Sequence, residues 1–245
     1  MSKSDELREF IIKYLDWFCP DSGSGSLPKL PVFDLCSQDY LEYAEQEMLA
    51  FQNGQKRYPT NAHLINCLAH LKRAIDCQLD TFLHVFNLYN IFSERNLKFE
   101  KKLDFLGAIG IFSPRSLTRL NSIRNKMEHE FEIPKIVDIE VYYDLTSAFV
   151  AILQKILLLT LDSEIDLDII HTVDNQDEQI GIFSIKYNFD QPNVSVHWRI
   201  NGIVKNLVCD LNELPDFAFF FKTYLLLYQK ESFATNKYII SQLSK

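Results

Sequence analysis

The chain has 245 residues, of which 47% are hydrophobic and 24% are charged, as in an ordinary folded protein. Its net charge of −8 excludes a protein that coats long nucleic acids through a broad basic surface, because neutralising phosphates needs many lysines and arginines. A small, locally basic site remains compatible with this charge. The 5 cysteines (Cys19, Cys36, Cys67, Cys77 and Cys209) form no CxxC pair, which favours a reducing cytoplasm over a disulfide framework or a zinc site.

No cofactor and no membrane anchor are expected. The sequence holds only 7 glycines against 19 phenylalanines and 11 tyrosines, and it lacks the glycine-rich loops that cradle phosphates. The most apolar run, around Leu157–Leu159, is far shorter than the roughly 20 residues that cross a bilayer. The N-terminus shows no signal-peptide pattern.

The first 34 residues divide into two units. Residues 1–19 are expected to hold an amphipathic helix, and residues 20–34, rich in Pro, Gly and Ser, are expected to be a flexible linker. The helix is predicted from one stripe of apolar side chains at spacings of three and four: Leu7, Phe10, Ile11, Tyr14, Leu15 and Phe18.

Residues 35–162 are expected to form an antiparallel helical bundle. Gly54 and Gly110 are predicted to end helices, and Ser113-Pro114 is predicted to begin one, which Pro134 ends. Apolar periodicity predicts helices over Gln38–Gln52, from Thr60 to Phe86, over Phe99–Ile109, and over Val137–Leu161.

Residues 163–245 change in texture. Alternating apolar and polar residues predict a three-stranded antiparallel meander over Ile180–Phe189, Val194–Ile200 and Ile203–Cys209, with a hairpin turn at Asn201-Gly202. Two helices are expected afterwards, over Phe217–Tyr228 and Asn236–Leu243. The predicted class is therefore α+β, mainly α. The strand-rich part is expected to be separable from the bundle and to bind a regulatory protein partner.

One short motif carries chemistry, namely Arg124-Asn125-Lys126-Met127-Glu128-His129. It resembles the signature of the HEPN family, in which an arginine, often followed by a polar residue, precedes a histidine by four to six residues. The resemblance covers roughly Gln38–Leu161. It implies a HEPN-like bundle and a metal-independent endoribonuclease that acts as a dimer on RNA, of the toxin or anti-phage defence type. It also implies products with 2′,3′-cyclic phosphate and 5′-hydroxyl ends.

The residue types fit this chemistry. An imidazole such as His129 titrates near neutrality and suits proton transfer, while the planar guanidinium of Arg124 suits charge stabilisation on phosphate. Asn125 lies one helical turn from His129 and would orient the phosphate or the imidazole. Asp76 and Arg73 on the long helix, with Glu128, are supporting candidates.

Other interpretations stay open. Arg124 and Glu128 are four residues apart and could form a plain surface ion pair. The bundle could be a non-catalytic HEPN module that binds RNA, a nucleotide or a protein partner, or the chain could be a pure interaction protein. His63 and His70 lack an acidic partner at matching spacing, so packing is favoured over metal binding. Structural roles are likewise favoured for His197-Trp198-Arg199 and for the aromatic run of Phe217, Phe219, Phe220, Phe221, Tyr224 and Tyr228.

Overall fold

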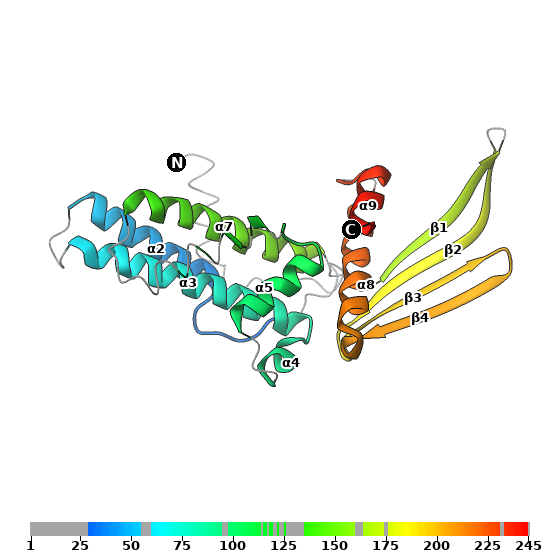
Figure 1. The fold of residues 1–245 in the computed structure, drawn as a ribbon, viewed down its shortest axis with the longest axis horizontal. Coiled ribbons are helices and arrows are strands. Elements are labelled where there is room, and N and C mark those ends of the chain that lie inside the picture. Colours follow the sequence, from blue (N-terminus) through cyan, green and yellow to red (C-terminus); the bar gives the residue numbers. More distant parts are fainter. Residues whose placement is uncertain are drawn as a thin grey trace, which may run out of the picture.

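The protein is α+β and mainly α, with a helical bundle at one end and an antiparallel sheet at the other (Figure 1). The computed structural model describes residues 29–54, 60–94, 98–113, 135–159, 164–173, 176–230 and 233–244, together with the single positions 115, 116, 118, 119, 122 and 125. The N-terminal unit 1–19 and most of the linker 20–34 therefore lie outside the described residues.

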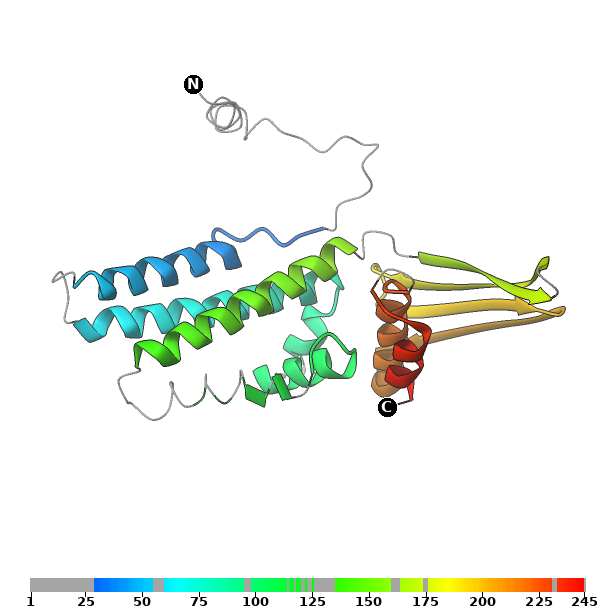
Figure 2. The ribbon, with the colours of Figure 1, turned by 90° about the horizontal axis from the view of Figure 1, so that it is seen from above.

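The bundle is built on three long helices that lie side by side: α2 (Ser37–Gln52), α3 (Thr60–Val85) and α7 (Ile136–Leu159) (Figures 1 and 2). Their bounds fall within a residue or two of the predicted ones. The shorter α5 (Phe99–Ala108) also matches its prediction, whereas the six-residue α4 (Tyr89–Glu94) was not predicted. Gly54 and Gly110 follow α2 and α5 with φ of 62° and 78°, the left-handed backbone that ends helices and favours glycine.

Buried polar side chains tie the three helices together. Gln78 of α3 accepts hydrogen bonds from Ser37 Oγ at 2.7 Å and from Gln154 Nε2 of α7 at 3.2 Å. Between α2 and α3, Glu47 accepts from the buried His63 Nδ1 at 2.5 Å and from Asn66 Nδ2 at 3.2 Å. The acidic partner that the sequence did not assign to His63 therefore comes from the preceding helix.

The sheet corrects one prediction, because the meander has four strands. They follow chain order β1-β2-β3-β4, and every neighbouring pair is antiparallel. β2 (Gln176–Asn188), β3 (Asn193–Ile200) and β4 (Ile203–Asp210) cover the predicted strands, and β1 (Glu164–Val173) is the addition. The turn between β3 and β4 has φ of 51° at Asn201 and 78° at Gly202, which confirms the predicted hairpin.

Two C-terminal helices lie where the sequence placed them, α8 (Leu214–Leu227) and α9 (Asn236–Leu243), with a short 3₁₀ turn, η2 (Leu211–Glu213), before α8. α8 stands between the bundle and the sheet (Figures 1 and 2). Phe221 of α8 contacts Phe86 after α3, Phe105 of α5 and Tyr187 of β2, with ring centroids 4.9, 6.4 and 5.0 Å away. Tyr187 donates a hydrogen bond to the Phe86 carbonyl at 2.7 Å.

These contacts make one apolar core that runs from the bundle through α8 into the sheet. The sequence pattern changes from helical to strand-like near residue 162, but the hydrophobic core continues across this point. The shared core argues against the expectation that the strand-rich part separates from the bundle.

A pH-dependent contribution to stability is expected from His70. Its ring lies against Tyr40 and Tyr43 of α2, and burial lowers its pKa, with the nearby Arg73 charge adding to the shift. The unfolded chain then binds more protons below about pH 6.5, so this stability is complete above that pH and is lost as pH falls through the lower folded-state pKa. In urea titrations at pH 7.5 and 5.5, His70→Phe should lose less stability on acidification than the parent. Equal losses would contradict this.

Candidate functional site

The start of the motif segment, Ser113–Pro134, is fixed by capping and by stacking. The backbone N–H of Ser116 donates to Ser113 Oγ at 3.2 Å and to the Ser113 carbonyl at 3.0 Å, the pattern of a serine that caps a helix. Just before it, Phe112 stacks on Phe149 of α7 with centroids 4.9 Å apart. The predicted helix start is confirmed here, although Pro114 lies outside the described residues.

Within the motif segment the structure describes six positions, 115, 116, 118, 119, 122 and 125, and all six are helical. They lie on the side of the bundle opposite α2 (Figure 2). Asn125 is half-buried, whereas the other five are exposed. Arg124, Glu128 and His129 lie outside the described residues, so the proposed trio is represented in the structure by Asn125.

The two supporting candidates on α3 are placed. Arg73 is exposed and lies near enough to His70 to affect its pKa, while Asp76 is half-buried. Their spacing on α3 is as predicted, and their relation to Arg124 and His129 stays a prediction.

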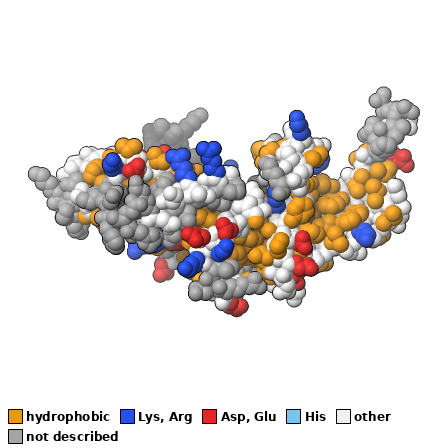
Figure 3. Space-filling model, viewed as in Figure 1, with side chains coloured by type: hydrophobic (Ala, Val, Ile, Leu, Met, Phe, Trp, Pro, Cys, Tyr) orange, Lys and Arg blue, Asp and Glu red, His pale blue; other side chains and the backbone are white. Residues whose placement is uncertain are grey.

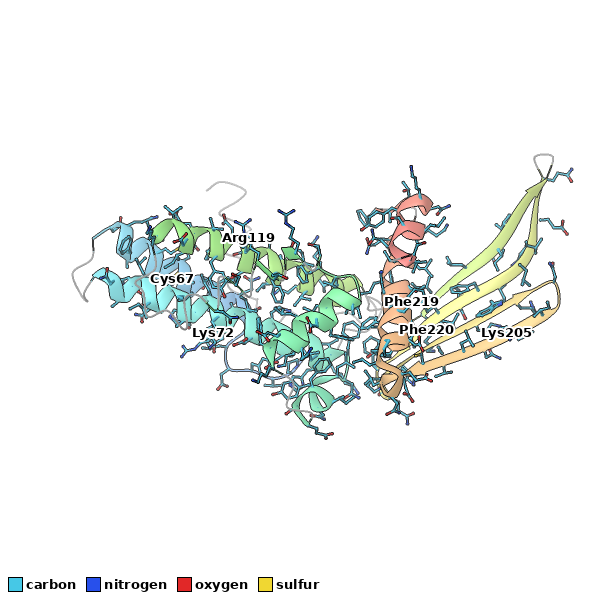
Figure 4. The ribbon with its side chains drawn as sticks, in the orientation of Figure 1. Cys67, Lys72, Arg119, Lys205, Phe219 and Phe220 are labelled. Atoms are coloured by element: carbon cyan, nitrogen blue, oxygen red, sulfur yellow. The ribbon has the colours of Figure 1, made fainter. Side chains whose placement is uncertain are left out.

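The motif segment carries two further cations that were not among the predicted site residues. Arg115 and Arg119 are exposed and four residues apart on helical backbone, which puts both side chains on one face. Figure 4 labels Arg119.

A sequence signal could have found them. Residues 105–127 contain no Asp or Glu, yet they hold Arg115, Arg119, Arg124 and Lys126, in a chain whose net charge is −8. An acid-free run with clustered cations is the local basic site that the overall charge left possible.

Histidine and cysteine on the α2–α3 seam do not form a metal site. Cys67 is fully buried, and burial, together with the Glu47 charge, raises the pKa of its thiol to about 12. A thiol this hard to ionise is a poor metal ligand. Within the described ranges, no group of three or more His, Cys, Asp or Glu side chains could hold a metal ion. In the described structure His63 hydrogen-bonds to Glu47, and His70 packs against the rings of Tyr40 and Tyr43.

A groove among the described residues lies between α7, α8 and α9 and has a volume of about 490 Å³. Apolar side chains such as Ile152, Ile156 and Leu226 line it. Its two lysines are Lys155 and Lys222, and Lys222 already donates to the Gln242 carbonyl at the end of α9. No histidine and no carboxylate is among the described residues that line the groove.

Comparison with known protein families, with curated proteins and with solved structures found no match. None of the described helices is both long enough and apolar enough to cross a membrane. What the chain does must therefore be inferred from its own residues.

Proposed function

We propose that the protein is a metal-independent endoribonuclease of the HEPN type that works as a dimer. The observation that supports this most is the motif segment itself: every described position in it is helical, and Arg115 and Arg119 extend the positive charge of the motif along its exposed side. A plain surface ion pair between Arg124 and Glu128 would not require the further cations Arg115, Arg119 and Lys126, which come before the acids Glu128, Glu130 and Glu132 in the sequence.

In the proposed reaction, one His129 imidazole takes the proton of the ribose 2′-hydroxyl, whose oxygen attacks the adjacent phosphorus. The bond to the 5′-oxygen breaks, and a second, protonated imidazole gives that oxygen its proton. Arg124 stabilises the extra negative charge on the phosphate oxygens, and Asn125 holds the phosphate in place. The products carry a 2′,3′-cyclic phosphate and a 5′-hydroxyl.

Arg115 and Arg119 have a separate role in this proposal. Because they are exposed and lie on helical backbone in the motif segment, they would bind phosphates that flank the cleaved bond. Their contribution should depend on salt, since it comes from screened charges at the surface.

The direct test is to incubate the purified protein with a pool of transfer and messenger RNA in EDTA and to sequence the 5′-hydroxyl ends. Discrete cleavage sites in EDTA are expected, because no step uses a metal ion. Binding of RNA without any cleavage would instead indicate a non-catalytic HEPN module, which binds RNA, a nucleotide or a protein partner. Cleavage that EDTA abolishes would indicate a different nuclease.

The dimer is a second expectation. One His129 cannot be deprotonated as a base and protonated as an acid in the same step, so a composite site needs two copies. Light scattering at micromolar concentration should give about twice the 28.7 kDa chain mass. A protein that stays monomeric and still cleaves RNA would contradict the composite site.

A further inference from the structure

The sheet has one apolar face, and only half of it is covered. Residues directly opposite in antiparallel strands share a face, so Leu167, Phe183, Trp198 and Lys205 form one row across all four strands. The next row outward is Ile169, Gly181, Ile200 and Ile203. Near α8 the same face is buried, at Ile185, Tyr187, Val194, Val196 and Cys209.

The half that α8 does not cover is termed here the open apolar face. In it Ile203 is 61% exposed and the edge residue Leu207 is 43% exposed. Figure 3 shows hydrophobic side chains gathered continuously over this part of the sheet. Its members are Leu167, Ile169, Phe183, Trp198, Ile200, Ile203 and Leu207, of which all but the last two are half-buried.

Charge is segregated between the two faces. The opposite face is mixed: it carries the polar row Asp166, Ser184, His197 and Asn206, the charged Asp168 and Arg199, and the exposed Val204 and Val208. In the two rows named above, from Leu167 to Lys205 and from Ile169 to Ile203, the one charged group is Lys205, which Figure 4 labels on β4. An apolar surface of this extent marks a contact with another protein segment.

We propose that residues Leu7–Phe18 form a helix that covers the open apolar face within the same chain. Their stripe of Leu7, Phe10, Ile11, Tyr14, Leu15 and Phe18 needs an apolar partner, as any amphipathic helix does. A helix of this length is about 18 Å long, which matches the width of four strands spaced about 4.8 Å apart. Placed beside α8, it would complete a layer of two helices over the sheet.

The chain enters the described structure beside the end of α3, where the bundle meets the sheet. Phe33 packs against His84 near the end of α3, with ring centroids 6.1 Å apart, and two residues later Phe86 contacts Tyr187 of β2. Residues 19–28 separate the predicted helix from Lys29, the first described residue. Ten residues span up to about 33 to 36 Å when extended, and this span sets how far from Lys29 the helix can lie.

Charge complementarity points the same way. Residues 5–18 contain four acids (Asp5, Glu6, Glu9 and Asp16) and two bases (Arg8 and Lys13), which gives a net charge of −2. This acidic helix would face two rows of the sheet whose one charge is the cation of Lys205. A second copy of the chain, or a different protein, would instead have to cover the face in trans.

The test uses Trp198 as a probe, because the only other tryptophan is Trp17 in the predicted helix. In the full chain carrying Trp17→Phe, acrylamide quenching of Trp198 fluorescence should rise at least about twofold on Ile11→Glu, which puts a charge into the stripe. Ile12→Glu, about 100° further round the helix, is the matched control and should change little. Ile203→Glu should act like Ile11→Glu, and Val204→Glu, on the opposite face, like the control.

Circular dichroism and melting temperature check that each variant is folded. Equal quenching in all four variants and the parent would overturn the proposal. So would protection of Trp198 that weakens on dilution, since that would show a second copy on the face. The proposal does not depend on RNA cleavage, so its failure and the failure of the proposed function are separate results.

Discussion

His129→Ala and Arg124→Ala should each reduce RNA cleavage by at least about 10²-fold. This is the scale of loss when a general acid or base, or a group that stabilises developing charge, is removed. Folding should survive both changes, because a surface ion pair is worth under about 1 kcal/mol. Cleavage rates in EDTA and thermal melts of the same samples provide the measurement.

Matched variants sharpen this test. His197→Ala removes a histidine that bonds to Asn206 on the sheet, at 2.6 Å, and it should leave cleavage unchanged. Asn125→Ala should reduce the RNA cleavage rate less than His129→Ala or Arg124→Ala. Arg115→Ala and Arg119→Ala should weaken RNA binding and reduce its dependence on salt, with little effect on the rate at saturation. If His129→Ala cleaves as fast as the parent, the catalytic role falls and a binding module becomes the better account.

Local signals predicted the elements whose ends depend on backbone geometry. Gly54, Gly110 and Asn201-Gly202 all adopt positive φ, and each marks the end of an element that the sequence placed there. Ser113 caps a helix as expected from its hydroxyl and the proline after it. These features require only a few consecutive residues, so they can be recognised without knowing the fold.

Features that depend on distant partners were missed. β1 alternates Ile165, Leu167 and Ile169 with Asp166 and Asp168, a strand pattern that its acids made resemble a loop, and only pairing with β2 shows where it belongs. Glu47 is 16 residues from His63, so their hydrogen bond was not visible in the spacing within one helix. The motif residues Arg124, Asn125 and His129 could be predicted from their residue types. The nearby cations Arg115 and Arg119 become apparent only when the absence of acids from residues 105–127 is considered.

Because bundle residues are buried against α8 and the sheet, we expect a chain truncated after Asp162 to lose its folded structure. The cut removes Tyr187, Phe217 and Phe221, against which Phe86 and Phe105 of the bundle are buried. Exposing a buried phenylalanine costs about 1.5 to 3 kcal/mol, and several such losses approach the 5 to 15 kcal/mol that a whole domain holds. The truncated chain should therefore show no cooperative thermal transition.

A point substitution separates loss of the shared core from loss of the sheet as a whole. Phe221→Ala should lower stability by about 3 to 5 kcal/mol, because its ring is fully buried among Phe86, Phe105 and Tyr187. Phe233→Ala is the matched control, since that ring is 82% exposed and should change stability by under about 0.5 kcal/mol. Urea titration of the two variants measures the difference. If the truncated chain melts cooperatively and Phe221→Ala resembles Phe233→Ala, the bundle folds alone and the sheet is a separate unit. If both lose stability as expected, whatever binds to the sheet can affect the bundle through the shared core.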